Sequence, residues 1–312
     1  MLHKFNKVGG GELVKTYIGV DLGGTNVRAA IVDEEGKVLV QKKRPSYAQE
    51  GKEKVMDTII NLIKSLPDYE SCSGIGVGVP GPCDEKTGSM VLATNLPGLE
   101  GYSIANKLEE TFHMPSFIDN DANVAALAEA LVGAGKGKKV VYYVTLSTGI
   151  GGGLVINGEC ISGKHGFTGE IANIIIDRNR SKVNYLAVGA IENEASGTAI
   201  TRKANEKASK KYKHAGEVFE DAHNGDSVAK EIVDNVARDL AQLFATIACV
   251  CDPDIFILGG GMMQSSDLFL PLVIENFKEI SHTQLHDDEF VLASLVEPGV
   301  IGAAMLPKSK NC

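Results

Sequence analysis

The sequence predicts an α/β fold with two related domains that face one cleft, because one pattern of strands and turns occurs twice. From residue 17 to 43, β-branched residues surround a Gly-Gly turn and a "DEEGK" turn, which predicts a three-stranded meander. From residue 140 the same order returns as "VVYYVTL", "STGIGG", "GLVI", "NGE" and "CIS". A duplicated unit with a glycine turn in each copy is typical of two related domains.

Further helices and buried strands follow each meander. The segment "KEKVMDTIINLIKSL" has apolar residues at helical spacing and stops before Pro67. We then expect a strand "GIGVGVP", a helix near 103–112, a strand "SFI" and an alanine-rich helix that begins near Asp121. After the second meander, helices are expected over 190–212, 215–223 and "SVAKEIVDNVARDLAQLFATIACV", and a buried strand "DIFILGGG" runs into another helix.

Composition restricts the classes of function. The formal net charge of −9 argues against nucleic acid as the main partner, because phosphate backbones are bound by clustered Lys and Arg. No stretch reaches the apolar length of a membrane span, and the polar start lacks the apolar core of a signal peptide. The six cysteines show no disulfide spacing, so we expect buried, reduced thiols and a cytoplasmic location.

Three glycine loops, "DLGGT", "STGIGG" and "LGGG", each follow an expected strand. Glycine lets backbone N–H groups approach phosphate oxygens closely, although a single loop of this kind is equally typical of an ordinary hairpin. Three loops in a duplicated fold favour nucleotide binding, and none fits the Walker or Rossmann pattern. A hairpin does not require the carboxylate of Asp21, whereas a cation bound to a nucleotide does.

These segments resemble the ROK group of sugar kinases and repressors, within the actin, hexokinase and Hsp70 ATPase superfamily. The resemblance covers almost the whole chain, and its motifs occur in order: "GVDLGGTNVRAAIVD", "GVGVPGP", "FIDNDANVAALAEA", "TLSTGIGGGLVINGE", "GFTGEIAN", "EASGTA" and "ILGGGM". It implies two related actin-like ATPase (ribonuclease H-like) domains with a central cleft. We expect an N-terminal domain of residues 1–119 plus 300–312, with the first phosphate loop and the sugar side, and a C-terminal domain of residues 120–299.

The resemblance also implies nucleotide-binding residues. Gly23, Gly24 and Thr25 would hold ATP phosphates, with Asp21 near magnesium, directly or through a water. A second phosphate loop would contain Thr148, Gly149 and Gly151. Gly260 and Gly261 would border the adenosine.

Asp121 matches the general base of the family. Such a base accepts the alcohol proton as the new bond to phosphorus forms. The alternative for Asp121 is a helix N-cap, which aspartate often provides. For the sugar, the match points to Asn120, Glu170, Glu192 and Asn173 and to backbone near Gly81, because amides and carboxylates suit a polyol. Glu192 could instead be an exposed glutamate at a helix start.

One region departs from the family pattern. Most members have His where this chain has Asn173, followed by a cysteine cluster that binds structural zinc. Here "DRNRSKVNYLAVGAIENE" contains no cysteine, and amide and lysine side chains are poor zinc ligands. We therefore expect no structural zinc. We also expect apolar packing of Ile174, Ile175, Ile176, Leu186, Val188 and Ile191 to hold the segment.

The resemblance implies ATP- and Mg²⁺-dependent phosphorylation of a hexose hydroxyl, with glucose as the leading acceptor and a homodimer as the assembly. Mannose, fructose, N-acetylhexosamines and β-glucosides are alternative acceptors, and polyphosphate is an alternative donor. A sugar-sensing protein without catalysis also stays open. A repressor is disfavoured because only sixteen residues precede Tyr17, too few for a helix-turn-helix.

Overall fold

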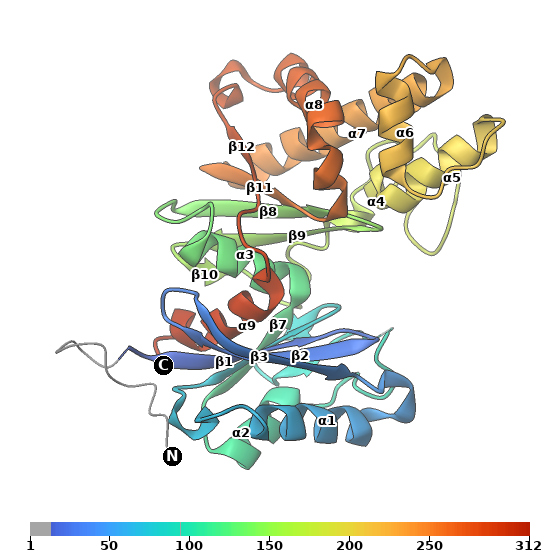
Figure 1. The fold of residues 1–312 in the computed structure, drawn as a ribbon. Coiled ribbons are helices and arrows are strands. Elements are labelled where there is room, and N and C mark those ends of the chain that lie inside the picture. Colours follow the sequence, from blue (N-terminus) through green and yellow to red (C-terminus); the bar gives the residue numbers. More distant parts are fainter. Residues whose placement is uncertain (1–13, 94) are drawn as a thin grey trace. The chain divides into compact units, whose positions relative to one another are not determined.

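The computed structural model describes residues 14–93 and 95–312 and has an α/β fold with two five-stranded sheets (Figure 1). Contacts divide the chain into two compact units. Unit 1 contains residues 1–137, 153–169 and 294–312, of which residues 1–13 and 94 lie outside the described part. Unit 2 contains residues 138–152 and 170–293.

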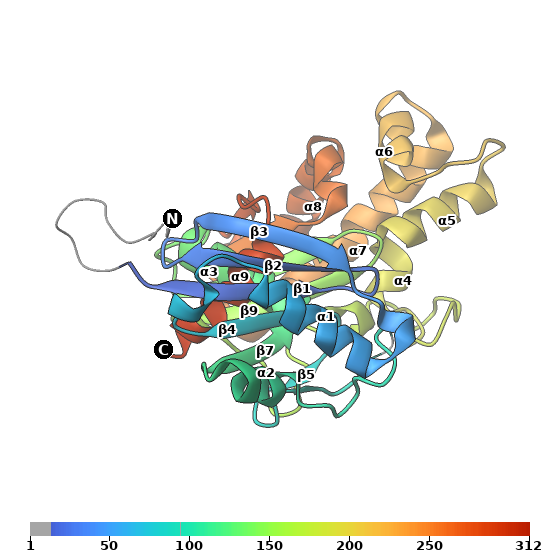
Figure 2. The ribbon, with the colours of Figure 1, turned by 60° about the horizontal axis from the view of Figure 1, so that its bottom comes forward.

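The sheet of unit 1 has the strand order β3-β2-β1-β4-β7, which can be followed in Figure 2. Its strands are β1 (Thr16–Leu22), β2 (Asn26–Asp33), β3 (Val38–Pro45), β4 (Ile75–Val79) and β7 (Ser116–Asn120). The first three form the expected antiparallel meander, whereas β4 and β7 run parallel to β1. The short strands β5 (Cys83–Asp84) and β6 (Ser89–Met90) pair separately.

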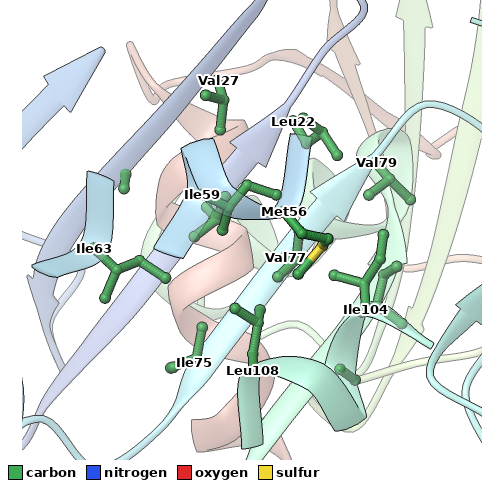
Figure 3. Packing of buried hydrophobic residues seen from close by; sticks show 14 of the residues in the cluster. Leu22, Val27, Met56, Ile59, Ile63, Ile75, Val77, Val79, Ile104 and Leu108 are labelled. Atoms are coloured by element: carbon green, nitrogen blue, oxygen red, sulfur yellow. The ribbon is translucent and has the colours of Figure 1, made fainter. Parts of the chain in front are cut away.

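Helices cover both faces of this sheet. On one face, α1 (Lys52–Lys64) and α2 (Ile104–Phe112) pack their apolar sides against the strands, and Figure 3 shows the resulting core around Met56, Ile59 and Leu108. On the other face, α9 (Pro298–Ser309) lies so close to the strands that a Cβ at Gly76 would stand 1.8 Å from the carbonyl oxygen of Ala303. Glycine is required there because only a strand without a side chain allows this approach.

Helix α3 (Asp121–Val132) packs against α9 and contains the fully buried carboxylate of Glu129. One of its oxygens accepts hydrogen bonds from the backbone N–H groups of Ser294 and Leu295, each at 2.9 Å. The other accepts from the N–H of Ala134 at 2.9 Å and from the Ser294 hydroxyl at 3.0 Å. Glu129 therefore joins α3 to the segment after it and to the segment that leads into α9.

The second sheet has the order β10-β9-β8-β11-β12, and the division between the units passes through β9. Its strands are β8 (Val140–Leu146), β9 (Ile150–Ile156), β10 (Glu159–Cys160), β11 (Ile255–Gly259) and β12 (Glu289–Leu292). In unit 2, β11 runs parallel to both β8 and β12. The helices of unit 2 are α4 (Ile191–Ala195), α5 (Gly197–Lys207), α6 (Ala215–His223), α7 (Ser227–Cys251) and α8 (Ser266–Ile280).

Aromatic rings connect the layers of unit 2. Phe256 of β11 stacks on Phe290 of β12 with ring centroids 4.9 Å apart, and Phe244 of α7 meets both rings edge-on. Phe277 of α8 completes the cluster with a centroid 5.2 Å from that of Phe290. Helices α7 and α8 are thereby fixed on one face of the parallel strands.

Short helical turns complete the described structure. They are η1 (Ala48–Glu50), η2 (Tyr69–Ser71), η3 (Ile171–Asn173), η4 (Gly261–Ser265) and η5 (Thr283–Leu285). No helix in the described residues is long and apolar enough to cross a membrane.

Several expectations from the sequence need correction. The single helix expected over 190–212 is two helices, because Ser196 is extended and its hydroxyl accepts from the N–H of Ala199 as the cap of α5. All six cysteines are free thiols, but only Cys72, Cys83 and Cys160 are buried, and Cys249 is exposed at the end of α7. Residues 120–137, 153–169 and 294–299 were expected in the second domain but belong to unit 1 by contacts, and α3 in the first of these stretches packs on α9. The assignment of functions to two domains stays a prediction.

Candidate active site

In unit 1, candidate residues gather where the parallel strands β1, β4 and β7 end. Asp21 pairs in register with Gly78, and Gly78 with Asp119, so the two carboxylates stand on either side of β4, with Cα atoms ~9.5 Å apart. Gly81 follows β4, and Asn120 and Asp121 follow directly on Asp119. The carboxyl edge of a parallel sheet is the usual place for ligands in α/β proteins.

The first glycine loop is a tight turn between β1 and β2. The N–H of Gly23 donates to the carbonyl of Asn26 at 2.9 Å, while Gly24 and Thr25 are exposed. The buried Ser46 fixes the loop, since its hydroxyl donates to the Gly24 carbonyl at 2.8 Å and its N–H donates to the Thr25 carbonyl at 2.9 Å. The loop therefore presents a rigid backbone without bulky side chains, as phosphate binding requires.

Asp21 precedes this loop and is partly buried. Burial raises its pKa, the Arg28 guanidinium lowers it, and the Glu297 carboxylate raises it further. Arg28 lies 3.8 Å from Asp21 but donates to Glu297 at 2.6 Å, so its tight partner is Glu297. A Cβ at Gly299 would stand 3.4 Å from the Asp21 carboxyl carbon, so a glycine leaves space beside this carboxylate. Oxygen ligands with open space suit Mg²⁺, and Asp21 fits the expected ion on these grounds.

Asp121 is the first residue of α3 and is exposed. The helix cap is Asn120, whose side-chain oxygen accepts from the N–H groups of Ala122 at 2.8 Å and Asn123 at 3.4 Å. The alternative of Asp121 as the N-cap is therefore wrong. The buried Asp119 carboxylate accepts from the N–H of Asn120 at 2.7 Å and from the Asn123 side chain at 2.8 Å, and burial raises its pKa. Asp119 was not singled out from the sequence, although it fixes the start of α3.

Gly81 has a φ of 124°, and a Cβ there would stand 2.9 Å from the carbonyl oxygen of Leu92. Both facts require glycine at this position. The backbone after β4 is thereby brought against the segment that contains Leu92.

In unit 2, two further glycine loops follow the parallel strands β8 and β11. Thr148 and Gly149 follow β8, Gly151 lies in β9, and Gly260 and Gly261 follow β11. Gly260 has a φ of 91°, and a Cβ there would stand 2.3 Å from the carbonyl oxygen of Leu146. The loop after β11 can approach β8 only because this residue is glycine.

A cavity of about 720 Å³ lies beside these loops, entirely within unit 2. Thr148 and Gly261 line it together with residues along α5, around the start of α6 and from η4, among them Arg202, Asn205, His214 and Gln264. This volume is in the range typical of ligand pockets. Of this lining, the sequence identified Thr148 and Gly261 but not Arg202, Asn205 or Glu220, which lie in no motif.

Glu192 lies in α4 beside the glycine loop that follows β8. Its carboxylate accepts from the N–H of Ile150 at 2.9 Å, and a Cβ at Gly149 would stand only 2.6 Å from the same oxygen. The alternative of an exposed glutamate at a helix start is wrong, since Glu192 is half-buried. Loss of surrounding water, and then the nearby Glu192 carboxylate, raise the pKa of Glu170.

The segment between Asn173 and Glu192 differs from the expected apolar cluster. Ile176, Leu186 and Ile191 are buried, but Ile175 and Val188 are exposed. Asn173 accepts a hydrogen bond from the N–H of Ala187 at 2.7 Å, which leaves its amide N–H groups for a ligand. Among the described residues, no group of three or more His, Cys, Asp or Glu side chains could hold a metal ion. The absence of zinc stays a prediction.

Comparisons with known proteins agree with this geometry. The two sheets, with glycine loops after their parallel strands, define a protein of the actin-like ATPase fold. The chain belongs to the ROK family, whose profile matches residues 17–310. It is 33% identical to a glucokinase of Halalkalibacterium halodurans over 95% of this chain and 96% of the relative.

Two solved structures extend the comparison. The ROK hexokinase from Thermus thermophilus superimposes with a TM-score of 0.82 at 29% identity and covers 95% of this chain and 100% of its own. A ROK family glucokinase from Streptomyces griseus, in complex with glucose and AMPPNP, gives a TM-score of 0.73 at 28% identity. The match covers 93% of this chain and 98% of the glucokinase chain.

Proposed function

We propose that this protein transfers the terminal phosphoryl group of ATP to a hydroxyl of a hexose, with glucose as the first acceptor to test. The observation that carries the proposal is the placement of Asp21, Gly81 and Asp121 at one edge of the sheet of unit 1. The cavity beside the glycine loops of unit 2 and the glucokinase relatives support it.

In this proposal Asp121 accepts the proton of the sugar hydroxyl while the hydroxyl oxygen bonds to phosphorus and the bond to ADP breaks. Its exposed position at the start of α3 suits a base that must reach a substrate. An ordinary carboxylate suffices, because the hydroxyl becomes acidic only late in the step. Asn120, Glu170, Asn173 and Glu192 would bind sugar hydroxyls, with backbone near Gly81.

The nucleotide would bind through the glycine loops. Gly23, Gly24 and Thr25 would hold phosphates in unit 1, and Thr148, Gly149 and Gly151 would do so in unit 2. Gly260 and Gly261 would border the adenosine in the cavity. Asp21 would hold Mg²⁺, directly or through a water, and the ion would neutralise charge on the phosphates.

The test is a panel of hexoses and N-acetylhexosamines with ATP and Mg²⁺, monitored by coupled detection of ADP. Phosphorus NMR of the product identifies the hydroxyl that is modified. A parallel series with polyphosphate tests the alternative donor. Sugar binding measured by calorimetry without ADP formation from any sugar would contradict the kinase and favour a sugar sensor.

The assembly and location are further proposals. The family resemblance implies a homodimer, which size-exclusion chromatography with light scattering tests directly. The composition predicts the cytoplasm, which cell fractionation tests.

A further inference from the structure

Residues 174–190 connect two groups of proposed sugar-binding residues. Asn173 ends η3 just before this segment, and α4 begins at Ile191 just after it, with Glu192 as its second residue. The segment contains no helix or strand, and two of its apolar side chains, Ile175 and Tyr185, are 48% and 87% exposed. Apolar packing alone therefore does not hold it.

Arg180 anchors this segment through three carboxylates. Its Nε donates to Asp177 at 3.0 Å, its Nη1 to Glu194 of α4 at 2.9 Å, and its Nη2 to Asp239 of α7 at 3.0 Å. All four residues lie in unit 2. A planar guanidinium with five donors suits this arrangement, whereas a lysine ammonium cannot reproduce it.

Two of these carboxylates are buried and need a cation. The side chains of Glu194 and Asp239 are only 5% and 8% exposed, whereas that of Arg180 is 32% exposed. Lys203 also binds Glu194, at 2.6 Å. Within the described residues, however, Arg180 makes the only hydrogen bond to the Asp239 side chain. Removal of Arg180 would leave the buried Asp239 carboxylate without a hydrogen-bond partner and with only the charge of Lys203 nearby, which is costly.

Helix α4 transmits this contact to the candidate site. Residues two apart on a helix point about 200° apart, so Glu192 and Glu194 extend from nearly opposite sides of α4. Glu194 is held by Arg180, and Glu192 accepts from the N–H of Ile150. The rotation of this short helix thus determines where the Glu192 carboxylate lies.

The same segment contacts the other sugar-binding candidate. Ala187 donates to the Asn173 side chain, and Gln242 of α7 donates to the carbonyl of Ile176 at 3.0 Å. We propose that Arg180 is a positioning residue for sugar binding, which holds residues 174–190 and α4 on α7 and so places Asn173 and Glu192. This inference rests on the proposed function of the site.

The test compares Arg180→Met and Arg180→Lys with Arg178→Met as the matched control. Arg178 is an exposed arginine of the same segment and makes no ion pair within the described residues. We expect Arg180→Met to raise the sugar KM at least ~10-fold and to change kcat by no more than about threefold. The sugar KM of Arg180→Lys should lie between that of Arg180→Met and that of the control, which should equal the wild-type value. The KM for ATP should rise less than the sugar KM, because Arg180 itself contacts neither the glycine loops nor the cavity and reaches the loop at Gly149 only through Glu192.

Hydrogen exchange gives a second readout that does not depend on catalysis. Amides of residues 174–195 exchange faster in Arg180→Met, whereas those of β11 keep their protection. If the wild type is active and Arg180→Met has the same sugar KM, the inference is overturned. An equal rise in the KM for sugar and the KM for ATP would also overturn it. If Arg180→Met does not fold, Glu194→Gln tests the same contact from its other side. The sugar KM should then rise more than the KM for ATP, and an unchanged sugar KM would overturn the inference. If the wild type phosphorylates none of the sugars, the proposed function is refuted. Hydrogen exchange alone then tests whether Arg180 anchors residues 174–190, because that measurement does not depend on catalysis.

Discussion

Gly149→Ala is expected to disable the candidate site without unfolding the protein. The new Cβ would stand 2.6 Å from the Glu192 carboxylate oxygen, which is closer than carbon and oxygen can approach. The carboxylate is the end of a flexible side chain, so it can move away. That movement breaks its hydrogen bond from the N–H of Ile150, now 2.9 Å long.

The size of the effect follows from that bond. A hydrogen bond to a charged group contributes about 1.5–3 kcal/mol, which corresponds to about 10- to 150-fold in an equilibrium or rate ratio. We therefore expect the kcat/KM for the sugar to fall by about 10- to 150-fold in Gly149→Ala. The melting temperature should fall by several degrees, because the lost bond also stabilises the folded protein, but the variant should stay folded at the assay temperature. The assay is coupled ADP detection with varied sugar at saturating ATP.

A double-mutant cycle separates two explanations of the loss. If the methyl group acts through Glu192, the double variant Gly149→Ala with Glu192→Ala is no worse than Glu192→Ala alone. If the methyl group acts on a phosphate instead, the two losses multiply. The coupling of Gly149 to Glu192 is refuted if Gly149→Ala has the kcat/KM of the wild type. It is also refuted if the losses of kcat/KM in the two single variants multiply in the double variant.

The remaining predictions concern the base, the buried glutamate and zinc. Asp121→Asn should lower kcat at least ~100-fold while the melting temperature holds, and near-normal turnover would remove Asp121 from its role. Glu129→Gln should destabilise the protein by about 2 kcal/mol in chemical denaturation, because its amide nitrogen must face a donor at Ala134 or Ser294. Exposed Glu109→Gln is the control, and equal stability of the two variants contradicts the argument. Elemental analysis should find no stoichiometric zinc, and a zinc chelator should leave activity unchanged with excess Mg²⁺; one equivalent of zinc lost together with activity would show the opposite.

Local patterns predicted the main elements of both sheets. The meander of β1, β2 and β3 followed from β-branched residues and glycine turns, and α1 followed from the helical spacing of Val55, Met56 and Ile59. These signals are local, because period and turn chemistry act over a few residues. The strands β5, β6 and β12 gave no such signal. They are two to four residues long, and periodicity needs a longer stretch.

The candidate site was predicted only as far as its residues belong to motifs. Asp21, Asp121 and the glycine loops lie in short conspicuous stretches, whereas the roles of Asp119 and Arg180 depend on partners that folding brings together. Arg180 and Asp239 are 59 residues apart in the sequence. The apolar residues between Asn173 and Glu192 suggested a small core, but the ion pairs that hold the segment leave no periodic pattern.

The last helix shows how a motif can be completed by a distant part of the chain. Gly19 in β1 and Gly76 in β4 lack side chains on the face toward α9, and this absence lets the helix backbone lie directly on the sheet. The first turn of α9 consequently stands beside Asp21, with Gly299 against the carboxylate and Glu297 held by Arg28. Burial at this place and the Glu297 carboxylate raise the pKa of Asp21, and the Arg28 guanidinium lowers it, so the start of α9 contributes to the electrostatic surroundings of this carboxylate. The surroundings of the carboxylate in "DLGGTN" therefore depend on Gly19 and Gly76 within the strands, which let α9 approach, as well as on the loop that follows Asp21.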